Sequence, residues 1–135
     1  MKFVKISQKE LKEMATFYQG VMATAYEGLF YREGKVIGKS ILEVITESES
    51  ILQKCSKLIE ARGWVEEVIL EDEKAFTQGS VEVNTDAVSP TCHRLRGILA
   101  AVYEKENGGL VEVKEIRCES LGDDHCEFEI DKGIF

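Results

Sequence analysis

The chain has 135 residues, of which 44% are hydrophobic and 31% are charged, a composition typical of one folded domain rather than a disordered chain. Its 25 acidic side chains outnumber 17 basic ones, giving a net charge of −8. Nucleic-acid and anionic membrane surfaces need clustered cations, so the charge argues against both kinds of partner. No apolar run approaches the roughly 18 residues of a membrane span. Residues 1–14 turn charged too soon for a signal peptide, so we expect a cytoplasmic protein.

The first half of the chain carries mainly helical patterns. KFVKI (2–6) alternates weakly and predicts either a short strand or an arm. Ser7 and Glu10 form a capping box, so a helix is expected to begin there, with apolar residues at helical spacing as far as Leu29. A second helical stretch spans 36–45. A third, SILQKCSKLIEARG (50–63), has one continuous apolar face and ends at a glycine.

The second half mixes strand and helix patterns. WVEEVIL (64–70) and SVEVNT (80–85) predict two strands. Ser89-Pro90 then opens a helix, with proline in its first turn, and Gly108-Gly109 ends it. LVEVKEIRC (110–118) and HCEFEID (125–131) predict two more strands. This order indicates an α+β fold in which helices pack on one face of a four-stranded antiparallel sheet.

GKVIGKS (34–40) superficially resembles a phosphate-binding loop. Such a loop needs four residues between its glycines and follows a buried strand. Here three residues separate the glycines and the preceding pattern is helical. A helical glycine costs about 1 kcal/mol relative to alanine. Gly28, Gly34 and Gly38 therefore predict that another backbone, or a ligand, approaches this helix closely.

Three of the four cysteines lie where a fold could bring them together. Cys92 falls in the first turn of the last predicted helix, Cys118 ends one strand, and Cys126 begins the next. Glu115 and Cys118 have opposite strand parity, so both can face inward only if the strand bulges near Glu115 and Ile116. Bulges often re-aim side chains at a site.

A glutamate buried beside three thiols is costly unless it is paired. Three thiolates and one carboxylate would make a tetrahedral site suited to Zn²⁺, with every ligand from the protein. The spacing contains no C-x-x-C pair, so the residues alone leave reduced, buried cysteines as the alternative. Disulfides are rare in a reducing cytosol. Cys55 lies on an apolar helix face and is predicted to be a core residue.

The segment CHRLRGILAAVYEKENGGLVEVKEIRCESLGDDHCEFEI (92–130) resembles the V4R (4-vinyl reductase) domain. The likeness rests on a helix opened by cysteine, V-x-E-x-x-C, and a G-D-x-x-C-x-F hairpin. YREGKVIGKS (31–40) is similar to that family's Y-x-x-G-x-x-x-G helix. The resemblance implies one ligand-binding domain over residues 1–135, with residues 1–20 as an arm and helix start that the likeness barely covers.

The resemblance also implies a fold shared with subunits of a vesicle-tethering complex and with sensory domains of aromatic-responsive transcriptional activators. In those sensory domains a zinc ion is held by cysteines and a glutamate whose order and spacing match Cys92, Glu115, Cys118 and Cys126. His93 and His125 are expected to point away from such a site, since each is the chain neighbour of a ligand.

The resemblance further implies a small hydrophobic or aromatic ligand between helices and sheet. The inward-facing candidates are Phe30, Tyr31, Trp64, Val102, Tyr103 and Val113. Plain core packing is the alternative for each of them. The polar residues that orient a phenol in the sensors have no clear counterpart here, which argues against a role specific to phenol.

Three functions follow as hypotheses. The first is a small-molecule-binding module, a sensor or carrier, with structural zinc; a closed four-ligand site does not activate water, and no catalytic set is recognisable. The second is a reductase of a tetrapyrrole vinyl group, which would need a separate electron donor because the chain lacks G-x-G-x-x-G. The third is a protein-interaction scaffold. A homodimer is also predicted, from the resemblance and from apolar surface at Met14, Phe17, Met22 and Tyr26.

Overall fold

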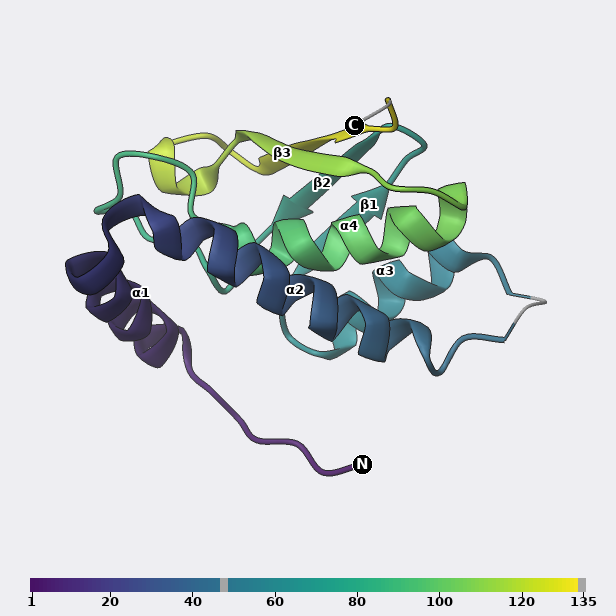
Figure 1. The fold of residues 1–135 in the computed structure, drawn as a ribbon, viewed down its shortest axis with the longest axis horizontal. Coiled ribbons are helices and arrows are strands. Elements are labelled where there is room, and N and C mark those ends of the chain that lie inside the picture. The colour runs from purple at the N-terminus through teal and green to yellow at the C-terminus, as the bar shows by residue number, and fades with distance from the viewer. Residues whose placement is uncertain (47–48, 134–135) are drawn as a thin grey trace.

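The computed structural model describes residues 1–46 and 49–133 (Figure 1). Its helices and strands, in chain order, are α1 (Gln8–Met22), α2 (Tyr26–Leu42), α3 (Ile51–Ala61), β1 (Glu67–Leu70), β2 (Lys74–Gln78), α4 (His93–Asn107), β3 (Glu112–Arg117) and β4 (Cys126–Asp131), with short 3₁₀ turns at Ala23–Ala25 and Glu119–Leu121. None of these helices combines the length and apolar character that a bilayer-spanning segment requires.

The strands form one antiparallel sheet in the order β1-β2-β4-β3. Helices α3 and α4 pack against the sheet, and α2 packs against α4 (Figure 1). The predicted α+β class, with a helical layer on a four-stranded antiparallel sheet, is therefore confirmed. Inward side chains alternate along the strands, as in Cys126, Phe128 and Ile130 of β4, and they form the core with the buried face of α4.

The contact between α2 and α4 depends on glycines. A Cβ atom at Gly34 would overlap the carbonyl oxygen of Arg94, and one at Gly97 would overlap the carbonyl oxygen of Tyr31. A Cβ at Gly38 would lie 2.8 Å from the carbonyl oxygen of Ile98. The close backbone approach predicted for Gly34 and Gly38 is confirmed, but the one predicted for Gly28 is wrong, because no other element of the described structure lies within 4 Å of a Cβ built there. GKVIGKS is helical rather than a phosphate loop.

Several helix ends follow their local sequence. The hydroxyl of Ser7 accepts the Glu10 N–H at 3.1 Å, and the Glu10 carboxylate accepts the Ser7 N–H at 2.9 Å, which confirms the capping box. Gly108 ends α4 with φ +74°. Residues 2–6 form an arm and no strand. The break between α1 and α2, where Ala23 has φ 52°, is absent from the sequence prediction.

The strand predicted at SVEVNT (80–85) is wrong. The strand is β2, Lys74–Gln78, which lies between the two stretches predicted to be strands. Residues 80–85 turn because polar side chains bond the backbone two residues on: Ser80 Oγ accepts the Glu82 N–H at 3.2 Å, and Asn84 Oδ1 accepts the Asp86 N–H at 3.0 Å.

The predicted start of the last helix at Pro90 is also wrong. Helix α4 begins at His93, and Cys92 is its N-cap residue with non-helical φ −86° and ψ 56°. The carboxylate of Glu82 accepts the N–H groups of Arg94 and Leu95 at 3.2 and 2.9 Å. A side chain distant in sequence thus caps this helix, which a local pattern does not reveal.

Candidate metal centre

Cys92, Glu115, Cys118 and Cys126 meet in one buried cluster. One ligand atom from each residue lies within 4.8 Å of the other three. The cysteines are fully buried and Glu115 is 8% exposed. Cys92 comes from the N-cap of α4, Glu115 from β3, and the other two cysteines from the ends of the β3–β4 connection. The cluster therefore joins the start of a helix to a hairpin.

A bulge in β3 turns Glu115 and Cys118 to the same side. Glu115 pairs with Phe128, but the next residue of β4, Glu127, pairs with Arg117. Ile116 is thus the extra residue, and it is 41% exposed. The predicted bulge is confirmed, and it places Ile116 outside while Cys118 reaches the core.

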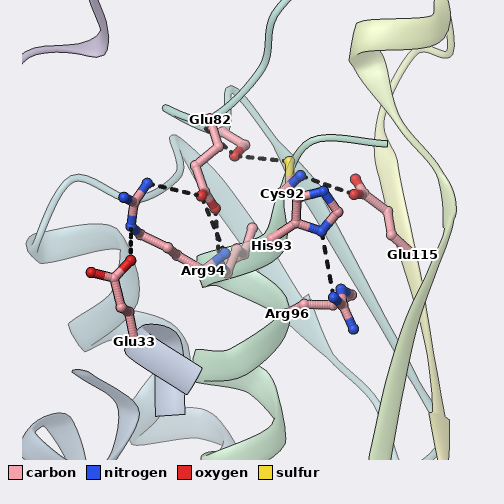
Figure 2. Close-up of polar contacts among 9 residues, drawn as sticks. Glu33, Glu82, Cys92, His93, Arg94, Arg96 and Glu115 are labelled. Carbon is pink, nitrogen blue, oxygen red and sulfur yellow. Dashed lines mark hydrogen bonds and ion pairs between the residues drawn. The ribbon is translucent and has the colours of Figure 1, made fainter. Parts of the chain in front are cut away.

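The two oxygens of Glu115 have different surroundings. Oε1 accepts the backbone N–H of Cys92 at 3.0 Å (Figure 2). Oε2 is buried and has no hydrogen-bond partner among the described residues. An unpaired buried acceptor costs about 1–3 kcal/mol, more when it is charged. A cation beside the three sulfurs would remove that cost, so the residues fit a metal ion.

The sulfur atoms interact strongly with one another. Hydrogen bonds donated by the thiols of Cys92 and Cys126 lower the pKa of Cys118 and raise the pKa values of the donors. Burial, with the nearby sulfur of Cys118, raises the pKa of Glu115 to about 8. A divalent ion bound by these sulfurs would displace the protons that the thiols carry.

Each sulfur also has a polar neighbour outside the cluster. Cys92 Sγ lies 3.2 Å from Ser80 Oγ, and Cys118 Sγ lies 3.8 Å from Thr91 Oγ1. Cys126 Sγ accepts the backbone N–H of Glu119 at 3.3 Å. Three thiolates, a carboxylate and a divalent ion sum to a charge of about −2, which such donors offset.

Neither histidine joins the cluster within the described chain. His93 is buried, and its Nδ1 lies 3.4 Å from a guanidinium nitrogen of Arg96 (Figure 2). Its Nε2 lies 3.7 Å from Glu27 Oε1. Burial, followed by the Arg96 charge, lowers the pKa of His93 to about 4, so the ring is neutral near pH 7. His125 lies against Phe76.

A second polar group surrounds Arg94 (Figure 2). Its guanidinium lies 3.6 Å from the ring centroid of Phe30, and its Nε donates to Glu33 Oε1 at 3.2 Å. Burial raises the pKa of Glu82, the residue that caps α4, to about 7. The sequence prediction missed Glu82, because an acidic residue in a strand-like pattern normally faces solvent.

The six predicted ligand-binding residues do not share one cavity among those found in the described structure. Phe30 lines a cavity of about 300 Å³ between α1, α2 and residues 81–91. Trp64 lines a groove beside the N-terminal arm, and Val113 lines another beside Glu115. Val102 and Tyr103 are fully buried in the core, and Tyr31 packs against its edge.

Residues 76–132 match the model of the V4R domain. The predicted resemblance to this family is confirmed. The four clustered residues all lie within the V4R match. The chain is also 24% identical over 111 residues to the uncharacterized protein MJ0150 of Methanocaldococcus jannaschii, covering 76% of this chain and 62% of that protein. It thus spans less than two thirds of that relative's length.

Two solved structures share the fold of this chain. The phenol-responsive sensory domain of the transcription activator PoxR, solved with phenol, has a TM-score of 0.81 and 17% identity over 97% of this chain and 77% of its own. A vinyl-4-reductase family protein from Methanocaldococcus jannaschii has a TM-score of 0.68 and 17% identity over 98% of this chain and 85% of its own. At this identity the likeness establishes the fold.

Proposed function

We propose that this protein is a small-molecule-binding module, a sensor or carrier of a hydrophobic or aromatic compound, built around a structural zinc ion. The observation that carries the metal half is the buried set of three thiols and Glu115, whose Oε2 has no partner in the described chain. Sulfur donors with one carboxylate favour Zn²⁺ over the harder divalent ions.

The four residues would hold zinc in a structural role. All four positions of a tetrahedral site are taken by the protein, so none is left for a reacting water. When bound, the ion supplies cross-linking between the start of α4 and the β3–β4 hairpin. The Cys92 N–H orients the Glu115 carboxylate, and the neighbouring hydroxyl and N–H donors offset the negative charge.

We place the ligand in the cavity of about 300 Å³ between α1, α2 and residues 81–91. Apolar cavities of about 150 Å³ hold benzene, so a compound with one aromatic ring would fit. Phe30 and Tyr26 supply ring surfaces, while Thr16 and Gln19 supply hydrogen-bonding groups. The PoxR domain, which shares the fold and binds phenol, supports this class of ligand.

Metal analysis of the purified full chain tests the first half of this proposal. We expect about one zinc per chain by native mass spectrometry and elemental analysis. Cys126→Ser should lose the ion, because serine is a poor zinc ligand. Cys55→Ala is the matched control: Cys55 is equally buried but lies outside the cluster, so this variant should keep its zinc. A folded wild-type protein without stoichiometric metal would contradict the proposal.

Calorimetric titration with phenol tests the ligand half, together with mass spectrometry of small molecules that co-purify. Phe30→Leu should weaken binding about fivefold, because an aliphatic side chain loses the aromatic pair contact, worth about 1 kcal/mol. Phe17→Leu, at a ring 67% exposed outside the cavity, should leave binding unchanged. The absence of both phenol binding and any co-purifying compound would argue against a ligand-binding role.

A further inference from the structure

Residues 79–91, here called the β2–α4 loop, contact both the candidate metal centre and the proposed ligand cavity. The loop connects the end of β2 with the N-cap of α4. It lies outside the set of metal ligands, and its side chains are not those predicted for ligand binding. Its contacts show how the two sites are connected.

On the metal side, hydroxyl groups tie the loop to the cysteines. Ser80 Oγ lies 3.2 Å from Cys92 Sγ. Thr91 Oγ1 lies 3.8 Å from Cys118 Sγ and 2.7 Å from Ser120 Oγ. The backbone N–H of Asn84 donates to Ser120 Oγ at 2.8 Å. The loop is thus fastened beside two of the three sulfurs.

On the cavity side, the same loop forms a wall. Residues 81–84, 86–89 and 91 line the cavity, opposite residues of α1 and α2. Glu82 extends from this wall to cap α4, and its own N–H donates to Ser80 Oγ at 3.2 Å. Ser80 itself does not line the cavity. One hydroxyl therefore connects a sulfur of the metal centre with the backbone of the cavity wall.

The direction of the Ser80 hydrogen bond depends on the state of Cys92. A thiol donates to the hydroxyl oxygen, whereas a metal-bound thiolate can only accept. Ser80 would then donate to the thiolate while its oxygen still accepts the Glu82 N–H. Hydrogen bonds to a charged group are stronger than neutral ones, so an occupied metal centre would hold the loop more firmly.

We propose that Ser80 and Thr91 are positioning residues through which the bound metal holds the β2–α4 loop in place as the wall of the ligand cavity. This inference rests on the proposed function, since it concerns the regulation of that same site. Metal loss would then loosen the wall and weaken binding of the small molecule, although none of the four metal-binding residues lines the cavity. Coupling of this kind is reciprocal.

Amide hydrogen exchange on the zinc-loaded full chain tests the metal side of the coupling. In Ser80→Ala we expect the ion to remain and the amides of residues 82–84 to exchange about tenfold faster, the effect of losing about 1.4 kcal/mol of local hydrogen bonding. Ser80→Thr, which restores a hydroxyl, should exchange like the wild type. Thr85→Ala, at an exposed position of the same loop outside the cavity lining, should also do so, because the described structure shows no side-chain hydrogen bond at Thr85. Unchanged exchange in Ser80→Ala would overturn the inference.

Phenol binding tests the cavity side. The dissociation constant should rise about tenfold in Ser80→Ala and stay at the wild-type value in Ser80→Thr. If Ser80→Ala loses zinc, the exchange of residues 82–84 should match that of metal-stripped wild type, and a difference between the two would overturn the inference. Wild-type binding of phenol with no difference between the variants would refute the coupling and leave the proposed function intact. Failure of the wild type to bind phenol, together with the absence of any co-purifying compound, would count against the proposed function, and the exchange comparison would still decide the coupling.

Discussion

Glu115 is the one oxygen ligand in a candidate centre of sulfurs, and its two oxygens are used differently. One accepts the Cys92 N–H, which fixes the plane of the carboxylate, while the other lies unpaired beside the thiols. A charged group in such a position is stable only with a compensating cation. Its charge and its orientation therefore both bear on metal affinity.

Replacing Glu115 with glutamine should separate these two contributions. Glu115→Gln keeps a carbonyl oxygen for the Cys92 N–H but removes the charge, so zinc affinity should fall at least 10–100-fold, the range that loss of supporting contacts alone produces. Competition with a chromogenic chelator measures this change. Glu112→Gln, at an exposed position on the same strand, should leave the affinity unaltered; equal affinities for both variants would exclude Glu115 as a ligand.

Glu82 should make stability depend on pH. Burial raises the pKa of Glu82 from 4.5 to about 7, so its contribution to stability is fully present below pH 4.5 and is lost as the pH rises through 7. Glu82→Gln cannot ionise. The difference in unfolding free energy between Glu82→Gln and wild type should therefore shift by about 2–3 kcal/mol in favour of the variant when the pH is raised from 5 to 8. Urea unfolding at both pH values measures the gain, and exposed Glu129→Gln should show none.

At the scale of elements, the backbones of α2 and α4 approach so closely that side chains are excluded at the crossing. Gly34 and Gly97 face each other there, and even a methyl group would overlap a carbonyl oxygen of the partner helix. This approach brings Tyr31 beside Arg96 and Phe30 beside Arg94, with cations over both rings. Helix α2 is thereby fixed relative to the first turn of α4, where the metal centre begins.

Alanine substitutions at two glycines of α2 should have opposite effects. Gly34→Ala should lower the unfolding free energy by about 3 kcal/mol or more, because rigid backbone on α4 must move. Gly28→Ala should raise it by about 1 kcal/mol, because no atom of the described structure beyond the neighbouring backbone of its own helix lies within 4 Å of the added methyl, and alanine favours helix. Chemical denaturation measures both, and equal effects would contradict the packing argument.

Elements with strong local signals were predictable from the sequence. The capping box of α1, the apolar face of α3 and the parity conflict in β3 all led to the observed structure. β2 was missed because its inward residues are Ala75 and Thr77, too small to produce an apolar alternation. The alternating valines of 80–85 instead belong to a turn fixed by side-chain hydrogen bonds.

The four residues of the candidate metal centre could be predicted from the sequence, but the residues that surround them could not. Without the family likeness, the residues left both a metal site and reduced thiols open and favoured reduced thiols, since the ligands come from two separate segments. The cap that Glu82 provides to α4, and the contact of Ser80 with Cys92, arise from tertiary packing of a loop. Local patterns carry no signal for such contacts.

At the scale of the whole molecule, α1 is unusual because none of its residues is buried within the described chain. Phe17 and Val21 are 67% and 72% exposed, and Met22 is 36% exposed. Apolar surface of this kind marks an interaction site. The homodimer predicted from the sequence would cover it.

Sedimentation of wild type and one charged variant tests this prediction. We expect a dimer at micromolar concentration, and Phe17→Glu should shift the equilibrium to monomer by placing a charge in the apolar contact. Ile69→Glu is the control, at a residue 61% exposed on β1 and far from α1 in the chain. A monomeric wild type, or an equal response of the two variants, would rule out α1 as the dimer surface.

The bulge in β3 also makes the spacing between Glu115 and Cys118 informative in homologous sequences. Two side chains on one face of a flat strand are separated by an odd number of residues, whereas Glu115 and Cys118 are separated by two. A chain with a single residue between the same glutamate and cysteine could reach the same face on an unbent strand. The length of this spacer, in any homologous sequence, therefore reports whether that edge of the sheet is kinked, whatever amino acids fill it.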